Sequence, residues 1–199
     1  MAEAISTYEI GPEDAGKPMS LDEFARVEGR PGHLYELSRG VIVVVDVPDV
    51  YHERVKGVIR DALVLYRVAH PGCINLMAEG SGYALRLPGM QSERHPDWAI
   101  YLNPPPVDVP QPWNFWIPEI VIEIVSEGGE ERDYVEKRED YLRAGVRLYW
   151  IVDPQQRTAM ALTRRGDLWQ EQRVGEPATL ATPLLPGFEL RLQDVFAVL

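Results

Sequence analysis

Two acidic residues lie in apolar surroundings where an ionised side chain is expensive. Glu123 interrupts the apolar run Ile120–Val125, and Asp97 opens a second apolar segment that continues to Leu102. An ionised carboxylate in such a run is costly unless it meets a cation, a metal or a proton. If the two segments are neighbouring strands, both carboxylates can point at one cation.

A helical stretch downstream supplies a positive charge. Asp133, Lys137 and Tyr141 follow one another at intervals of four residues, so they lie along one face of a helix. Metal-assisted phosphodiester hydrolysis needs carboxylates that hold a hard cation, and a positive charge for the developing oxyanion. We therefore predict that Asp97 and Glu123 bind Mg²⁺, with Mn²⁺ as a substitute, and that Lys137 acts beside them.

Three further positions are candidates for the same site. The backbone carbonyl of Val125, or of Ile124, is placed to add a metal ligand. Glu36 alternates with apolar neighbours in a short strand, and His52 opens a long helix. We include Glu36 among the catalytic candidates, and His52, with Asp133 and Tyr141, among the accessory ones.

Each of these residues also has a purely structural interpretation. Glu123 is equally a candidate for a buried ion pair with Lys137 or Arg138. Asp97 could equally be an acid that only begins a strand. Lys137 could equally be a surface lysine that forms an ion pair with Asp133 four residues earlier. The order and spacing of the residues favour the catalytic interpretation over these alternatives.

Periodicity and turn signals predict the elements that position these side chains. The Ser20–Glu23 capping box predicts a short helix that ends near Gly29, and the Pro-rich segment 103–118 should lack regular structure. We expect further helices at 55–69 and 130–143, strands at 34–37, 41–47, 74–79, 82–87, 97–102, 120–125 and 148–152, and a hairpin at 157–174. The order is mixed α/β, with a central mixed sheet flanked by helices and a parallel strand–helix–strand unit at 119–152.

Composition limits the classes of protein to be considered. A chain of 199 residues predicts one domain, over residues 18–199, after a flexible tail at 1–17. The net charge of −11 argues against a non-specific DNA coat but allows a nuclease whose acidic cluster binds a metal. No apolar run is long enough to span a membrane, no signal peptide opens the chain, and Cys73 has no cysteine partner, so we expect a cytoplasmic protein.

The motifs along the chain resemble those of a known family. The matching segments are Tyr35-Glu36-Leu37, Arg39-Gly40, His52, His95-Pro96-Asp97, Val121–Ser126, Arg132-Asp133, Lys137, Tyr141, Ala144-Gly145-Val146, Tyr149–Pro154 and Leu185–Phe188. On these residues the chain resembles the PD-(D/E)xK nuclease superfamily and, more narrowly, the Uma-two family of restriction-endonuclease-like proteins, over residues 18–196 or so.

The resemblance implies a restriction-endonuclease-like core and a Mg²⁺-dependent DNA endonuclease. It implies that Glu36, Asp97 and Glu123 face the metal, and that Lys137 is a lysine that has moved from the strand to the following helix. Two departures bear on this. Val125 stands where the superfamily motif has its lysine, and the acidic turn Glu127–Glu131 replaces a Ser-Pro-Ser-Thr-like turn.

Two other functions stay open from the sequence. The first is a catalytically weak or inactive module that keeps the nuclease fold and binds nucleic acid or protein. The second is a structural, dimer-forming protein. Trp113, Phe115 and Trp116 in the Pro-rich segment are candidate interface residues, so we expect a homodimer under every interpretation.

Overall fold

The computed structural model describes residues 8–45, 47–80 and 83–199, and these fall into two units. The larger unit comprises Pro48–Gly80 and Pro96–Leu199, and the smaller comprises Met1–Val47 and Ser81–His95. Asp97, Glu123 and Lys137 all belong to the larger unit, whereas Glu36 belongs to the smaller one.

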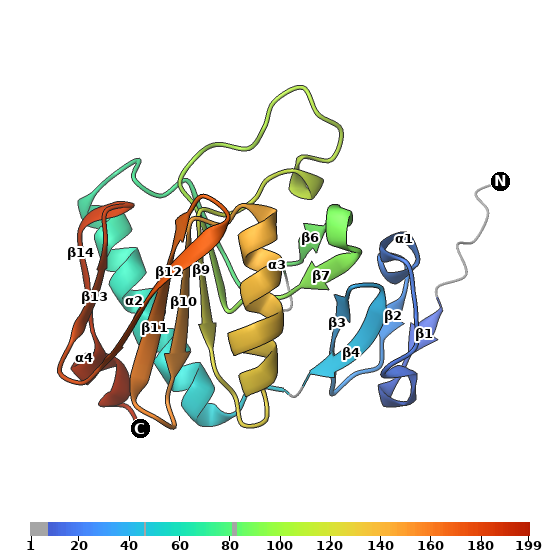
Figure 1. Ribbon diagram of the computed structural model, residues 1–199, viewed down its shortest axis with the longest axis horizontal. Helices are drawn as coiled ribbons and strands as arrows, with labels where there is room; N and C mark the ends of the chain where they lie inside the picture. Colours follow the sequence, from blue (N-terminus) through green and yellow to red (C-terminus); the bar gives the residue numbers. More distant parts are fainter. Residues whose placement is uncertain (1–7, 46, 81–82) are drawn as a thin grey trace. The chain divides into compact units, whose positions relative to one another are not determined.

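A six-stranded mixed sheet forms the centre of the larger unit (Figure 1). Its strand order is β12-β11-β10-β9-β8-β5. β9 and β10 pair in parallel, and all other neighbours in this sheet are antiparallel. The predicted parallel strand–helix–strand unit is therefore confirmed. The strands are β5 (Leu76–Ala78), β8 (Trp98–Tyr101), β9 (Ile120–Ile124), β10 (Leu148–Asp153), β11 (Thr158–Arg165) and β12 (Leu168–Gly175).

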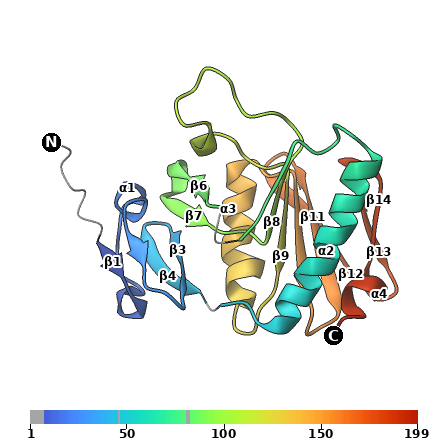
Figure 2. The same cartoon turned by 180° about the vertical axis from the view of Figure 1, so that it is seen from behind.

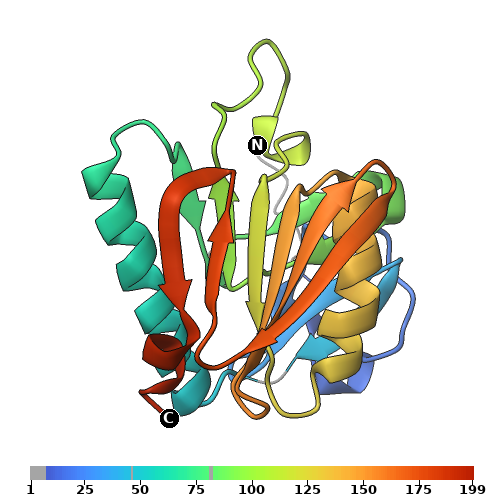
Figure 3. The same cartoon turned by 60° about the vertical axis from the view of Figure 1, so that its left-hand side comes forward.

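Helices cover both faces of this sheet. Figures 1 and 2 show α2 (Val50–Ala69) on one face and α3 (Lys137–Ala144) on the other. α4 (Leu192–Phe196) and the hairpin of β13 (Thr179–Thr182) and β14 (Leu185–Arg191) lie on the α2 side, as Figure 3 also shows.

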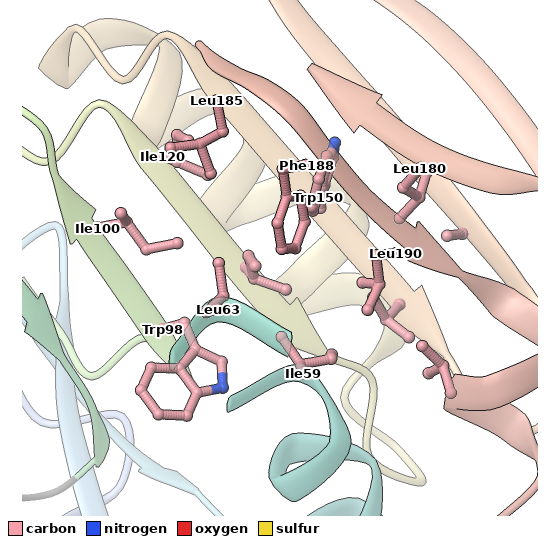
Figure 4. Packing of buried hydrophobic residues seen from close by; sticks show 14 of the residues in the cluster. Ile59, Leu63, Trp98, Ile100, Ile120, Trp150, Leu180, Leu185, Phe188 and Leu190 are labelled. Atoms are coloured by element: carbon pink, nitrogen blue, oxygen red, sulfur yellow. The ribbon is translucent and has the colours of Figure 1, made fainter. Parts of the chain in front are cut away.

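The hydrophobic core of the larger unit lies between the sheet and α2. Ile59 and Leu63 of α2 pack with Ile120 and Trp150 of the strands, and Phe188 of β14 joins them (Figure 4). Each of these side chains is at least nine-tenths buried. Apolar burial of this kind supplies most of the stabilising free energy of a domain.

Strand β9 divides its side chains between this core and the opposite face. Ile120, Ile122 and Ile124 join the core on the α2 side. Because successive strand residues point to opposite faces, Glu123 points toward α3. The one acid of this strand is thus kept out of the apolar core.

The predicted helix at 130–143 begins with a π-helical turn. This turn, η5, spans Arg132–Glu136, and α3 continues from Lys137 and ends at Gly145, which has a positive φ. Tyr149 of β10 donates a hydrogen bond from its hydroxyl to the carbonyl oxygen of Asp133, over 2.9 Å. This side chain therefore supplies a hydrogen bond to a backbone carbonyl within the π turn.

The smaller unit contains a four-stranded antiparallel sheet. Its order is β4-β3-β7-β6, with β3 (Leu34–Ser38), β4 (Val41–Val45), β6 (Leu85–Leu87) and β7 (Ser92–Arg94). Beside it lie α1 (Leu21–Phe24), η1 (Pro12–Asp14) and the parallel pair of β1 (Glu9–Ile10) and β2 (Glu28–Gly29). The core of this unit contains Ile10, Leu21, Phe24, Tyr35, Leu37 and Ile42.

Several expected boundaries need correction. The Ser20 capping box is present, but its helix ends at Phe24, not near Gly29. α2 begins at Val50, ahead of the apolar periodicity that starts at residue 55, because Asp49 caps it by accepting a hydrogen bond from His52 N; His52 therefore lies in the first turn, as the sequence predicts. β7, β13, β14 and α4 were not predicted. The predicted strands at 41–47 and 82–87 end at 45 and begin at 85, and residues 46, 81 and 82 lie outside the described residues.

The expected flexible tail at 1–17 is wrong for the part that the structure describes. Residues 9–14 form β1 and η1, and Ile10 is buried in the core of the smaller unit. Residues 1–7 lie outside the described residues. The single domain over 18–199 stays a prediction. Among the described residues, no helix has the length and apolarity that crossing a membrane requires.

Candidate active site

Glu123 receives two donors from the helical segment that faces β9. Its Oε1 lies 2.9 Å from Lys137 Nζ and accepts a hydrogen bond from Tyr141 Oη over 2.5 Å. Only 2% of Glu123 and 3% of Lys137 are exposed, and Tyr141 is fully buried. One oxygen of this carboxylate is thus held by a cation and a hydroxyl inside the unit.

Asp133 extends this group to a second acid. Its Oδ1 lies 3.2 Å from Lys137 Nζ, so the lysine is placed between two carboxylates. Asp133 is 1% exposed. The predicted alignment of Asp133, Lys137 and Tyr141 on one helix face is confirmed, although a π turn precedes α3 and shifts the register.

Asp97 lies beside Glu123 at the start of β8. The antiparallel register pairs Trp98 with Ile122, which brings the preceding and following residues together. Asp97 N donates to Glu123 Oε2 over 3.4 Å, and Asp97 Oδ2 accepts from Ile124 N over 2.8 Å. The two strand acids are therefore adjacent, as the sequence predicts.

His52 reaches Asp97 from the first turn of α2. Its Nε2 lies 3.0 Å from Asp97 Oδ2, and the imidazole is buried. Burial lowers the pKa of His52, but the hydrogen bond and the charge of Asp97 more than offset this, so the pKa is raised overall. His52 thus holds one oxygen of Asp97 in place.

Burial changes the pKa values of two carboxyl groups in this cluster. Burial raises the pKa of Glu123 to about 7, against the opposing charge of Lys137 and with the help of Asp97 and Asp133. Burial also raises the pKa of Asp133, although Lys137 and Arg132 lower it in part. An environment of this kind favours uptake of a proton or a further cation.

The donor atoms fit a hard divalent cation. Asp97 Oδ1 makes no hydrogen bond within the described part of the chain, and Glu123 Oε2 receives only the long one from Asp97 N. Among the described residues, no cluster of three or more His, Cys, Asp and Glu side chains is arranged to hold a metal ion. The site therefore offers two carboxylates, not three or more protein ligands. Two carboxylates suit Mg²⁺, which usually binds proteins through one or two carboxylates and keeps several waters.

Val125, the third predicted metal ligand, follows directly after the last residue of β9. Its N–H donates to the carbonyl oxygen of Val152 over 2.8 Å, and the residue is buried. The sequence predicts that its own carbonyl faces the metal, and this role stays a prediction.

Glu36 is engaged within the smaller unit. Its Oε2 lies 3.0 Å from the fully buried Arg94 guanidinium, and its Oε1 accepts from His95 N over 3.0 Å. The carboxylate is therefore compensated by a cation of its own unit. Its predicted role as a metal-facing acid stays a prediction.

Sequence reasoning missed Tyr149 and Arg94. Tyr149 packs edge-on against Tyr141, with 5.0 Å between ring centroids, and supports Asp133 through its hydroxyl. The parallel register, which only the structure gives, pairs Tyr149 with Val121 and so turns it to the face that carries Glu123. No pattern in the sequence marked Arg94 as the partner of Glu36.

Comparisons with known proteins bear on the family and the fold. A protein-family model described as "Uma2: Putative restriction endonuclease" matches residues 21–193. No curated protein matches the chain. A crystal structure of a putative nuclease belonging to DUF820 from Anabaena variabilis ATCC 29413 is similar, with a TM-score of 0.71 and 19% identity over 91% of this chain and 99% of that one. This likeness confirms the predicted mixed fold, a central mixed sheet flanked by helices.

Proposed function

Because the chain belongs to the Uma2 family of putative restriction endonucleases, we propose that it is a Mg²⁺-dependent DNA endonuclease. The observation that carries the proposal is the contact between two acids from neighbouring strands, Asp97 and Glu123, with Lys137 at 2.9 Å from the second. Family membership supports nuclease activity, and the choice of metal and of DNA as substrate is our inference from the donor set.

In this proposal Asp97 and Glu123 hold the cation through their oxygens. Bound Mg²⁺ would polarise a phosphate oxygen and lower the pKa of water. His52 and the N–H of Ile124 fix Asp97, while Tyr141 and Lys137 fix Glu123. Carboxylates held in this way need little reorganisation when substrate arrives.

Lys137 would supply the positive charge that stabilises the scissile phosphate as charge develops on it. It reaches Glu123 from the helix, which supports the interpretation of a lysine that has left the strand position now taken by Val125. Asp133 keeps the ammonium group on this side of the helix, at 3.2 Å.

One observation favours the alternative, an inactive module that binds nucleic acid or protein. Lys137 lies between two buried acids, Glu123 and Asp133, and a lysine held in this way has less charge to offer a phosphate. The alternative predicts binding of DNA without metal-dependent cleavage.

The test is cleavage of supercoiled plasmid and of single-stranded DNA with Mg²⁺, Mn²⁺ or EDTA. We expect the wild type to cut with either metal, Asp97→Ala to lose cutting, and the exposed-acid control Asp61→Ala to retain it. Folding of each variant is checked by circular dichroism. Cutting that survives in a folded Asp97→Ala variant would refute the site, and a wild type that binds but never cuts would favour the alternative.

We also propose a homodimer. Trp116 packs on Tyr101, with 4.1 Å between ring centroids, whereas Trp113 and Phe115 are 48% and 62% exposed. Exposed aromatic residues are enriched at interfaces. Light scattering during size exclusion should give twice the monomer mass for the wild type and a smaller mass for a Trp113→Ala/Phe115→Ala variant. An unchanged mass in that variant would exclude this surface.

A further inference from the structure

The smaller unit contains a pocket of about 410 Å³ that the proposed function does not use. This volume lies within the range of about 300 to 1,000 Å³ that is usual for ligand pockets. Phe24 and Val27 contribute apolar surface, whereas Arg86, Glu93 and His95 contribute polar groups. A pocket of this composition suits a flat ring with apolar faces and a polar edge.

The three polar residues form a row. Arg86 and Glu93 are directly opposite each other in the β6–β7 pair, so their side chains share a face. Arg86 Nε donates to Glu93 Oε2 over 3.0 Å, and His95 Nε2 lies 3.7 Å from Glu93 Oε1. The carboxylate therefore stands between the guanidinium and the imidazole.

The hydrogen-bonding character of the row follows from its chemistry. The guanidinium of Arg86 only donates, and the carboxylate of Glu93 only accepts when ionised. His95 Nδ1 lies 2.8 Å from the carbonyl oxygen of Tyr83, so Nδ1 donates and Nε2 of the neutral ring is an acceptor. With the His95 ring neutral, the order along the row is donor, acceptor, acceptor.

Tyr35 gives an independent sign that the pocket takes a polar ligand. This residue lines the pocket and is 8% exposed, and its hydroxyl has no hydrogen-bond partner among the described residues. Buried tyrosine hydroxyls usually find a partner, and an unmade bond costs free energy.

We propose that this pocket binds an unpaired guanine base. The Watson–Crick edge of guanine presents one acceptor, O6, followed by two donors, N1–H and the 2-amino group, which complements the row of Arg86, Glu93 and His95. Adenine places its amino donor where guanine has O6 and would face the guanidinium of Arg86. Enzymes that read a single unstacked base use hydrogen bonds to this edge and apolar contact with its faces.

This inference deepens the proposed function, because a guanine pocket would give the nuclease a base preference. It does not depend on cleavage, since the pocket lies wholly within the smaller unit and Asp97, Glu123 and Lys137 belong to the other. Binding of a free nucleotide can therefore be measured without metal or catalysis.

The experiment is calorimetric titration of the full chain, in EDTA, with guanosine, with 5′-GMP and with the 5′-monophosphates of adenosine, cytidine and uridine. We expect guanosine and GMP to bind about 5- to 150-fold more tightly than the other nucleotides, as one good bidentate pair allows. Guanosine tests whether the base, and not the phosphate, is recognised. Equal binding of all four nucleotides, or no binding of GMP, would overturn the proposal.

Variants locate the site. Glu93→Gln and Arg86→Met should each weaken GMP binding by at least about fivefold, whereas the controls Glu171→Gln and Arg60→Met, in the larger unit, should bind as the wild type does. Should Glu93→Gln fail to fold, the half-buried Arg86→Met and the nucleotide preference of the wild type still decide. GMP binding unchanged in Arg86→Met would place the ligand elsewhere. Asp97→Ala should bind GMP normally, so loss of cleavage and loss of base binding are separable.

Discussion

The raised pKa of Glu123 makes a quantitative prediction about stability. Its carboxyl has a pKa of about 7 in the folded protein, against an ordinary value of 4.5, chiefly because of burial. The folded state therefore holds this proton more tightly than the unfolded chain does. The stability that results is fully present below the unfolded pKa and is lost as the pH rises through the folded pKa.

Glu123→Gln tests this, because glutamine has the shape of the protonated acid and does not titrate. With a folded pKa of about 7 and an unfolded pKa of 4.5, the wild type should lose about 2 kcal/mol relative to the variant between about pH 5.5 and about pH 8.5. The free energy of unfolding of the wild type, relative to that of the variant, should thus be larger at the lower pH.

The assay is urea unfolding, followed by tryptophan fluorescence, at both pH values in EDTA. Each free energy of unfolding is extrapolated to water, and the wild type is compared with Glu123→Gln and with Asp61→Asn, an exposed acid on α2. Asp61→Asn should show no such pH-dependent difference. A wild-type-to-Gln difference that stays constant, or that moves in the opposite direction, would refute the idea that burial dominates at Glu123.

Three further outcomes follow from the same cluster. Lys137→Met should lower the free energy of unfolding by about 3 to 5 kcal/mol near pH 8, since it leaves Glu123 and Asp133 buried without their cation; in urea unfolding, the combination with Glu123→Gln should cost less than the sum of the two. Tyr141→Phe should cost about 1.5 to 3 kcal/mol, because it removes a hydrogen bond to a charged group, and a thermal melt below the wild type would show this. Addition of Mg²⁺ should raise the melting temperature of the wild type but not of Asp97→Ala, measured by differential scanning fluorimetry; an equal rise in both would argue against Asp97 as a ligand.

The sequence predicts the central sheet of the larger unit well because its signals are strong and local, whereas β13, β14 and α4 of the same unit were missed. The apolar run at β9, which Glu123 alone interrupts, and the apolar run at β10, with a helical stretch of suitable length between them, favour a parallel crossover. The same reasoning brings Asp97, Glu123 and Lys137 together, because the strands fix two of them and helix periodicity fixes the third.

The smaller unit is less predictable because its elements are short and its pairings are distant in sequence. β1 and β2 are two residues each. They form because Ile10 packs in the core of the smaller unit, not because their residues have a strong local preference for strands. β7 carries Glu93 and Arg94, which strand propensity disfavours or leaves neutral, and both are buried because other strands supply their partners.

The π turn at Arg132–Glu136 makes the contacts of Glu123 depend on chain length as well as on residue type. A π turn holds about one residue more than the α-helical turn that it replaces. Removing one residue there would restore a regular helix and rotate everything after it by about 100° relative to the preceding strand. Lys137 and Tyr141 would then leave Glu123, although every one of their identities was kept. In a homologue that lacks this extra residue, a cation from another position would therefore have to pair with the acid equivalent to Glu123, even where the acids align in sequence.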